Sequence, residues 1–184
     1  ENGCILHYIE NNSKLKNNDL LLIDAGAEYQ CYAADITRTF PVNGKFTPAQ
    51  RELYQIVLDA QYAAIEAVKP GNHWNQPHEA AVQVLTEGLV KLGLLQGNVD
   101  KLIEDQAYRE FYMHRTGHWL GMDVHDVGDY KIDCTWRLLE PGMVLTVEPG
   151  LYIRDPEHID KKWHFTGIRI EDDVVVTKEG HEVL

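Results

Sequence analysis

Acidic residues stand directly after three short apolar runs of this chain. Asp24 follows Leu-Leu-Leu-Ile, Glu148 follows Met-Val-Leu-Thr-Val, and Glu171 follows Gly-Ile-Arg-Ile. Short apolar runs of this kind, bounded by Gly or Pro, are typical of buried strands. Because an ionised carboxylate is rarely buried without a partner, each strand end predicts a compensating group close by.

Helical signals lie between the first and the last of these strands. Thr-Pro-Ala-Gln at 47–50 predicts a capped helix start, and Pro70 ends that helix. A second helix is expected over 75–93 and a shorter one after Asn98. Beyond His114, short apolar runs again predict strands. Strands, then helices, then strands indicate an α+β domain, and no linker or repeat divides it.

Charge and cysteine content restrict the partners. The 184 residues include 17 basic and 29 acidic side chains, a net charge of −12 that repels nucleic acid and anionic membranes. No apolar run reaches the roughly 18–20 residues that a membrane-spanning helix needs. The 3 cysteines are an odd number and widely spread, which predicts reduced thiols and a cytoplasmic location. A bound cation suits this charge balance.

Two pairs of facing carboxylates are expected. If the first two strands form a hairpin that turns at Tyr29 and Gln30, Asp24 lies opposite Asp35, with Cβ atoms about 5 Å apart. Glu148 and Glu171 would face each other in the same way if their strands are antiparallel neighbours. Like charges so close share a proton or hold a cation between them.

One histidine would complete a metal site. His114, His118 and His125 are the candidates, and glycines at 117 and 121 permit close backbone approach to a ligand. Four carboxylates and one neutral imidazole carry a charge that matches two divalent metal ions. Oxygen-rich ligation favours Mn²⁺, with cobalt, iron and zinc as alternatives. Such paired ions support hydrolysis of an amide.

At these residues the sequence resembles the proline-specific aminopeptidases (aminopeptidase P, or Xaa-Pro aminopeptidase) of the pita-bread metallopeptidase superfamily. The resemblance covers nearly the whole chain and is highly specific when its segments are taken together. The matching segments are Ile-Asp-Ala-Gly at 23–26, Asp-Ile-Thr-Arg-Thr-Phe-Pro at 35–41, Gly-His-Trp-Leu-Gly-Met-Asp-Val-His-Asp-Val-Gly at 117–128, Glu-Pro-Gly-Met-Val-Leu-Thr-Val-Glu-Pro-Gly-Leu-Tyr-Ile at 140–153 and Gly-Ile-Arg-Ile-Glu-Asp-Asp at 167–173.

The resemblance implies the pita-bread fold, a curved antiparallel sheet covered by helices. Members normally carry an N-terminal domain, and their catalytic domain begins before the segment equivalent to Glu1. Residues 1–184 are therefore expected to be an incomplete C-terminal metallopeptidase catalytic domain, truncated at its N-terminus. The resemblance also implies a homo-oligomer for the full-length protein.

The resemblance assigns a metal role to five residues. Asp24 would be a terminal ligand of one ion, and Asp35 and Glu171 would bridge both ions. His118 and Glu148 would hold the second ion. Glu148 would also exchange a proton with the metal-bound hydroxide.

Five further residues receive roles in the same way. His125 would hydrogen-bond the substrate or the tetrahedral intermediate, and His7 and His114 would shape the pocket for proline. Arg169 and Tyr152 match positions behind the ligands, where a fixed guanidinium can orient a ligating carboxylate and moderate the local negative charge.

The implied reaction removes an N-terminal residue from a peptide that has proline in second position. Prolidase, which cleaves Xaa-Pro dipeptides, shares the ligands and is the nearest alternative, although Trp119 after His118 favours the aminopeptidase. Methionine aminopeptidase fits the segment at 124–128 less well. A non-catalytic pita-bread binding module and a metal-free creatinase-like enzyme are both disfavoured because all five ligand positions are present.

Overall fold

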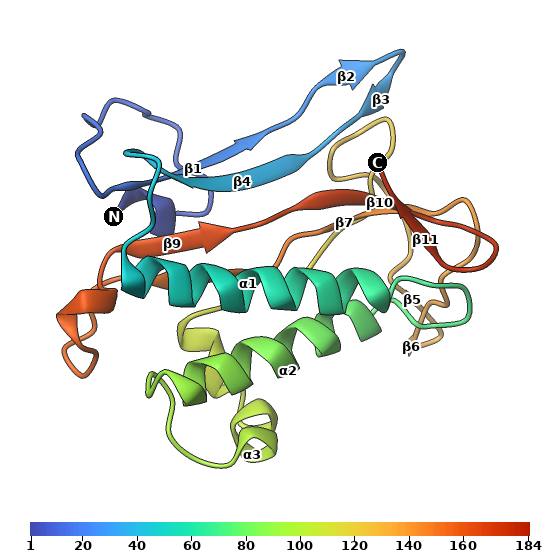
Figure 1. The fold of residues 1–184 in the computed structure, drawn as a ribbon. Coiled ribbons are helices and arrows are strands. Elements are labelled where there is room, and N and C mark those ends of the chain that lie inside the picture. Colours follow the sequence, from blue (N-terminus) through green and yellow to red (C-terminus); the bar gives the residue numbers. More distant parts are fainter.

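The computed structural model describes residues 1–184 and consists of helices that cover one face of an antiparallel sheet (Figure 1). Helix α1 lies along the sheet, α2 packs on α1, and α3 is farther out. The helices are α1 (Pro48–Glu66), α2 (Gln76–Lys91) and α3 (Val99–Glu104), with short 3₁₀ turns at Asn2–Cys4, Ala107–Glu110 and Lys161–Trp163. The strands are β1 (Leu20–Ala25), β2 (Glu28–Tyr29), β3 (Tyr32–Ala33), β4 (Ile36–Pro41), β5 (Lys131–Ile132), β6 (Thr135–Trp136), β7 (Val144–Val147), β8 (Gly150–Ile153), β9 (Thr166–Arg169), β10 (Asp172–Val176) and β11 (His181–Val183).

All three expected helices are present. The capping box at α1 is formed, since Thr47 Oγ1 accepts from the Gln50 N–H at 3.2 Å and Gln50 Oε1 accepts from the Thr47 N–H at 2.9 Å. Asn98 caps α3 in a similar way through the Lys101 N–H, whereas Asn75 makes no side-chain cap bond to α2. None of the helices is both long enough and apolar enough to span a membrane.

The C-terminal strands form one long antiparallel hairpin. Strand β7 pairs with β10, and β8 pairs with β9. The pairs Val147↔Asp172 and Gly150↔Arg169 belong to the same register, so Glu148 lies opposite Glu171 between them. The expectation that these two carboxylates face each other is confirmed.

Further strands extend this hairpin on both sides. Strand β1 pairs with β4, and a bridge between Thr37 and Glu171 joins β4 to the hairpin. On the other side the segment 116–120 runs antiparallel to β7, with the Glu148 N–H donating to the Thr116 carbonyl at 2.8 Å. Asp24, Glu171, Glu148 and His118 thus come from neighbouring segments of one sheet.

Side chains of the hairpin alternate between two faces. Ile168 and Ile170 are buried in the core cluster, together with residues of α1 and α2 such as Leu53 and Leu85. Arg169 and Glu171, at the intervening positions, belong to the opposite face, where both line a cavity. Period-two alternation therefore separates a dry core under the helices from a polar site on the other face.

The first hairpin corrects one expectation. Its turn lies at Gln30 and Cys31, not at Tyr29 and Gln30, and Asp24 is opposite Thr37 instead of Asp35. Gln30 and Cys31 have φ of 50° and 66°, the left-handed conformation that a two-residue hairpin turn requires. Residues of this type give little sequence signal for that turn, which explains the error.

The three cysteines are free, as expected. Cys4 is buried, whereas Cys31 and Cys134 are exposed at hairpin turns. The structure therefore relies on packing and hydrogen bonds, without a covalent cross-link.

Gly26 allows the two strands that carry Asp24 and Asp35 to approach closely. A Cβ atom at this position would lie 1.8 Å from the Ala34 carbonyl oxygen. We expect Gly26→Ala to lower the free energy of unfolding by about 1–3 kcal/mol, because backbone must move. The matched control is Gly180→Ala, since a Cβ there meets nothing within 4 Å. Urea unfolding followed by circular dichroism measures both variants, and equal stabilities would contradict the close approach.

Candidate metal centre

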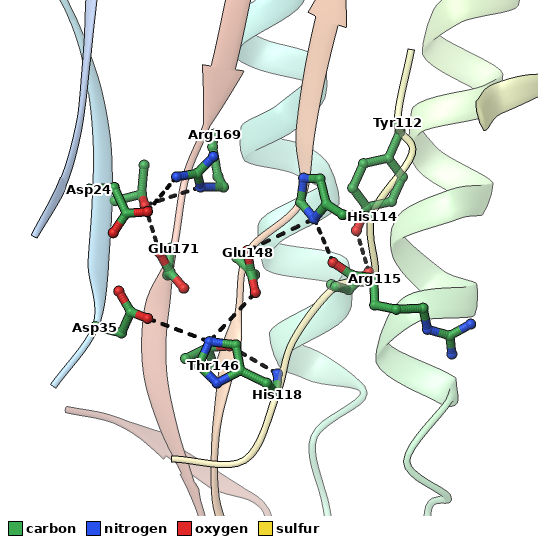
Figure 2. Close-up of polar contacts among 12 residues, drawn as sticks. Asp24, Asp35, Tyr112, His114, Arg115, His118, Thr146, Glu148, Arg169 and Glu171 are labelled. Atoms are coloured by element: carbon green, nitrogen blue, oxygen red, sulfur yellow. Dashed lines mark hydrogen bonds and ion pairs between the residues drawn. The ribbon is translucent and has the colours of Figure 1, made fainter. Parts of the chain in front are cut away.

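A cavity of about 220 Å³ lies on the face of the sheet opposite the core. Figure 2 shows the labelled carboxylates and His118 converging there from separate segments of the chain. All five predicted metal ligands line this cavity, as do four of the five further predicted residues. The lining residues are Leu6, His7, Asp24, Asp35, His114, Arg115, Gly117, His118, His125, Glu148, Arg169 and Glu171.

Three predicted ligands lie close enough to share one ion. Ligand atoms of Asp35, His118 and Glu171 are all within 4.8 Å of one another. His118 Nε2 is 3.4 Å from Asp35 Oδ2 and 3.8 Å from Glu148 Oε1. The structure therefore brings the single histidine to the acidic cluster, and among the three candidate histidines it is His118 that contacts two carboxylates.

Arg169 and Thr37 orient two of the carboxylates. The Arg169 guanidinium donates to Asp24 Oδ2 at 2.6 Å and to Thr37 Oγ1 at 3.2 Å. The Thr37 hydroxyl donates in turn to Glu171 Oε2 at 2.6 Å. This chain of bonds holds one oxygen of each carboxylate and leaves Asp24 Oδ1 and Glu171 Oε1 without a bond to Arg169 or Thr37. Asp24 is partly exposed, and Arg169 is buried.

The remaining predicted residues surround this cluster. The Tyr152 hydroxyl lies 2.8 Å from His114 Nε2 and accepts from Arg169 at 3.1 Å, so Tyr152 lies behind the cavity wall. The His125 ring packs edge-on against the His118 ring, with centroids 4.3 Å apart. His7 lines the cavity from the N-terminal segment. The structure thus brings all ten predicted residues to one place: nine line the cavity, and Tyr152 lies behind its wall.

Burial leaves the negative charges in the cavity only partly compensated. Loss of hydration raises the pKa of Glu148 to about 7, against the opposing effect of His118 and Arg169. Burial, with the charge of Glu148 added, raises the pKa of Glu171 to about 8. Burial also raises the pKa of Asp24 despite the nearby Arg169. The protein's own cations are therefore too few for this set of carboxylates.

His118 and Asp35 behave as a pair. Burial disfavours a charged His118, but its hydrogen bonds to Asp35 and to the Trp119 carbonyl and the charge of Glu148 together raise its pKa to about 9. The bond from His118 holds the pKa of Asp35 below its ordinary value. A protonated His118 thus partly neutralises the acidic cluster. A metal ion bound to the neutral imidazole would neutralise it more fully.

The donor set fits divalent metal ions. Four carboxylates and one imidazole converge on a cavity, and the raised pKa values of Glu148 and Glu171 record negative charge that lacks a counter-ion. Oxygen donors with one nitrogen donor suit manganese and related ions. Binding of such cations would release the protons that these groups hold in the metal-free chain.

Sequence reasoning missed several residues that support the site. Thr37 follows Asp35 by two residues, and residues at that spacing in a strand lie on the same face. This spacing could have identified Thr37. Asp173, in the Glu-Asp-Asp run, accepts the Asp35 N–H at 3.0 Å and is buried. Nothing in the sequence marks His78 on α2, whose Nδ1 lies 2.8 Å from Thr116 Oγ1.

Fold and donor set together define the class: an α+β protein with an acid-rich metal centre on one face of an antiparallel sheet. Comparison with known proteins agrees, because the family model "Metallopeptidase family M24" matches residues 1–178. The chain is also 55% identical over 183 residues to a Xaa-Pro aminopeptidase of Haemophilus influenzae. The chain therefore belongs to metallopeptidase family M24.

Solved structures give the fold within that family. The chain matches aminopeptidase PepP of Pseudomonas aeruginosa with a TM-score of 0.97 and 61% identity, and zinc-substituted Escherichia coli aminopeptidase P in complex with product with a TM-score of 0.95 and 55% identity. Each match covers 99% of this chain and 41% of the other. The Haemophilus relative is covered to 42% of its length. The chain thus has the pita-bread fold of aminopeptidase P and spans about two fifths of these relatives.

Burial of His78 predicts a pH dependence of stability. Burial first, and then the positive charges of Arg115, His114 and Arg109, lower the pKa of His78 from 6.5 to about 3. His78 binds a proton more readily in the unfolded chain than in the folded one. Its contribution to the free energy of unfolding is therefore fully present above pH 6.5 and is lost as the pH falls toward 3. Between pH 7 and 5 the loss is about 2 kcal/mol.

The variant His78→Asn removes the titrating group, so its unfolding free energy should fall about 2 kcal/mol less between pH 7 and 5 than that of the unsubstituted chain. Urea unfolding at several pH values measures the difference. His158→Asn, which replaces an exposed histidine, is the control and should keep the original slope. If the unfolding free energies of all three proteins change equally with pH, His78 is not buried in its neutral form.

Proposed function

We propose that residues 1–184 are part of the catalytic domain of a dinuclear, metal-dependent Xaa-Pro aminopeptidase. The reaction is hydrolysis of the bond between an N-terminal residue and a following proline. The observation that carries the proposal is the convergence of Asp35, His118 and Glu171, with ligand atoms within 4.8 Å of one another, in a cavity that two further carboxylates line. The Xaa-Pro aminopeptidase relatives support the choice of substrate class.

Two ions are proposed because four carboxylates carry the negative charge that two divalent cations balance. In this assignment Asp24 would complete the coordination of one ion, and His118 and Glu148 would complete the coordination of the other. Asp35 and Glu171 would contribute to both ions. Mn²⁺ is the proposed ion because carboxylate oxygens dominate the set.

Bound ions supply two things to this reaction: they polarise the scissile carbonyl and make hydroxide available near neutral pH. The chain's own residues do the rest. Glu148 lines the cavity among the proposed ligands and is placed to accept a proton from the attacking water and to pass it on to the leaving proline. His125, on the cavity wall, is placed to donate a hydrogen bond to the oxygen that gains charge.

Substrate binding follows from the charge and walls of the cavity. The negative cluster attracts the protonated amino terminus of a peptide. His7 and His114 line the cavity and would contact the proline ring. The Tyr152 hydroxyl, 2.8 Å from His114 Nε2, keeps that imidazole in one orientation.

Substrate choice is tested with a pair of peptides. We expect the manganese-loaded chain to release the first residue of an Xaa-Pro-Xaa tripeptide and to lose this activity with EDTA, because hydrolysis depends on the ions. Release of the first residue is measured by mass spectrometry. Cleavage of an Xaa-Pro dipeptide alone would indicate prolidase activity instead. Two bound ions without cleavage of either peptide would indicate a non-catalytic role.

The shared ligands are tested by metal binding. We expect Glu171→Gln and Asp35→Asn to abolish binding of two ions, because each loses a charge that both ions need. Mn²⁺ titration calorimetry gives the stoichiometry. Glu179→Gln, which changes an exposed acid outside the cavity, should bind as the unsubstituted chain does. Two ions bound by Glu171→Gln with unchanged affinity would overturn the bridging assignment.

A further inference from the structure

A column of three hydrogen-bonding side chains lies between helix α2 and the cavity wall. Thr116 Oγ1 is 2.8 Å from His78 Nδ1 and 2.6 Å from the Tyr112 hydroxyl. Tyr112 is labelled in Figure 2. Tyr112 and Thr116 are almost completely buried, with exposed fractions of 0% and 3%. None of the three residues belongs to the proposed metal ligands or contacts the proposed substrate.

The protons in this column have one consistent arrangement. The buried Tyr112 hydroxyl is protonated, because burial holds its pKa above the ordinary value, and Thr116 is its one hydrogen-bond partner. A buried hydroxyl donates to whatever acceptor it has, so Tyr112 donates to Thr116. The Thr116 proton must then go to His78 Nδ1, which accepts it only in the neutral ring with its proton on Nε2.

Thr116 links this column to the metal site through the backbone. It stands between His114 and His118 in the sequence, and its carbonyl accepts the Glu148 N–H at 2.8 Å. Packing beside this link is tight, since a Cβ on Gly117 would lie 2.0 Å from the Thr146 carbonyl oxygen. A shift of Thr116 therefore disturbs the positions of both His118 and Glu148.

We propose that His78 is a positioning residue of the metal centre: by accepting from Thr116, it fixes the segment that carries His118 against helix α2. The inference rests on the proposed metal site and adds a residue that contacts neither ion nor substrate. Removal of the acceptor frees the Thr116 side chain, and the paired ligands His118 and Glu148 lose their fixed separation. Partners of metal ligands typically affect metal affinity 10- to 100-fold.

The bonding itself is tested by NMR of histidine ring nitrogens in the full chain. The proposal requires His78 to be neutral near pH 7, with the proton on Nε2 and an unprotonated Nδ1. Assignment is made by comparison with His78→Asn. A proton on Nδ1 would make His78 the donor to Thr116 instead of the acceptor and would overturn the proposal.

The effect on the site is tested by Mn²⁺ affinity in titration calorimetry. His78→Phe keeps a ring without an acceptor and should bind Mn²⁺ about tenfold more weakly. His78→Asn places an amide oxygen near the position of Nδ1 and should restore affinity to within about threefold. Thr116→Val, which removes the hydroxyl, should weaken binding as much as His78→Phe, and the double variant should be no weaker than either single variant.

A buried hydroxyl elsewhere on α2 provides the control for general destabilisation. The Thr86 hydroxyl donates to the Val82 carbonyl at 2.7 Å, within the helix. Thr86→Val should lower the melting temperature without weakening Mn²⁺ binding. If Thr86→Val weakens binding as much as His78→Phe, or if His78→Phe binds like the unsubstituted chain, the inference is overturned while the metal site stands. If the unsubstituted chain binds no Mn²⁺, the proposed function fails, and this inference fails with it.

Discussion

The burial of like charges is the constraint on which this site depends. Asp24, Asp35, Glu148 and Glu171 all line one cavity, and of these four Arg169 donates directly only to Asp24 and reaches Glu171 through Thr37. Burial alone would drive these acids to take up protons, as the raised pKa values of Glu148 and Glu171 record. Cations remove this cost, and so the same feature that makes the metal-free site unfavourable makes it selective for divalent ions.

The antiparallel register explains how the chain assembles such a cluster. One register runs through the hairpin of β7–β8 and β9–β10, which places Glu148 opposite Glu171. On the core face of the same strands, Ile168 and Ile170 pack against the helices. A slip of one residue would send the carboxylates into the core and the isoleucines into the cavity, so packing of the core and assembly of the site specify the same register.

The sequence predicts those parts of the molecule that depend on local pattern. Apolar runs, the capping box at Thr47 and the facing of Glu148 and Glu171 are of this kind, and the structure agrees with them. The prediction that Asp24 faces Asp35 was wrong, because it depended on the position of the turn. The turn residues, Gln30 and Cys31, adopt positive φ, and their residue types give no local signal for it. His78 could not be predicted, since its partner Thr116 is 38 residues away and only the packing of α2 brings them together.

Helix α2 therefore has two connections, one to the core and one to the site. Its apolar face, with Leu85 and Leu89, is fully buried in the core, while His78 near its start bonds the segment that carries His118. Well-packed interiors resist small displacements, because even a shift of about 0.5 Å loses a sizeable part of the contact energy. A metal centre needs that stiffness, since ligands drawn from separate strands keep their separation only if the elements behind them do not move. The core of this protein thus determines the geometry of the site as well as the stability of the fold.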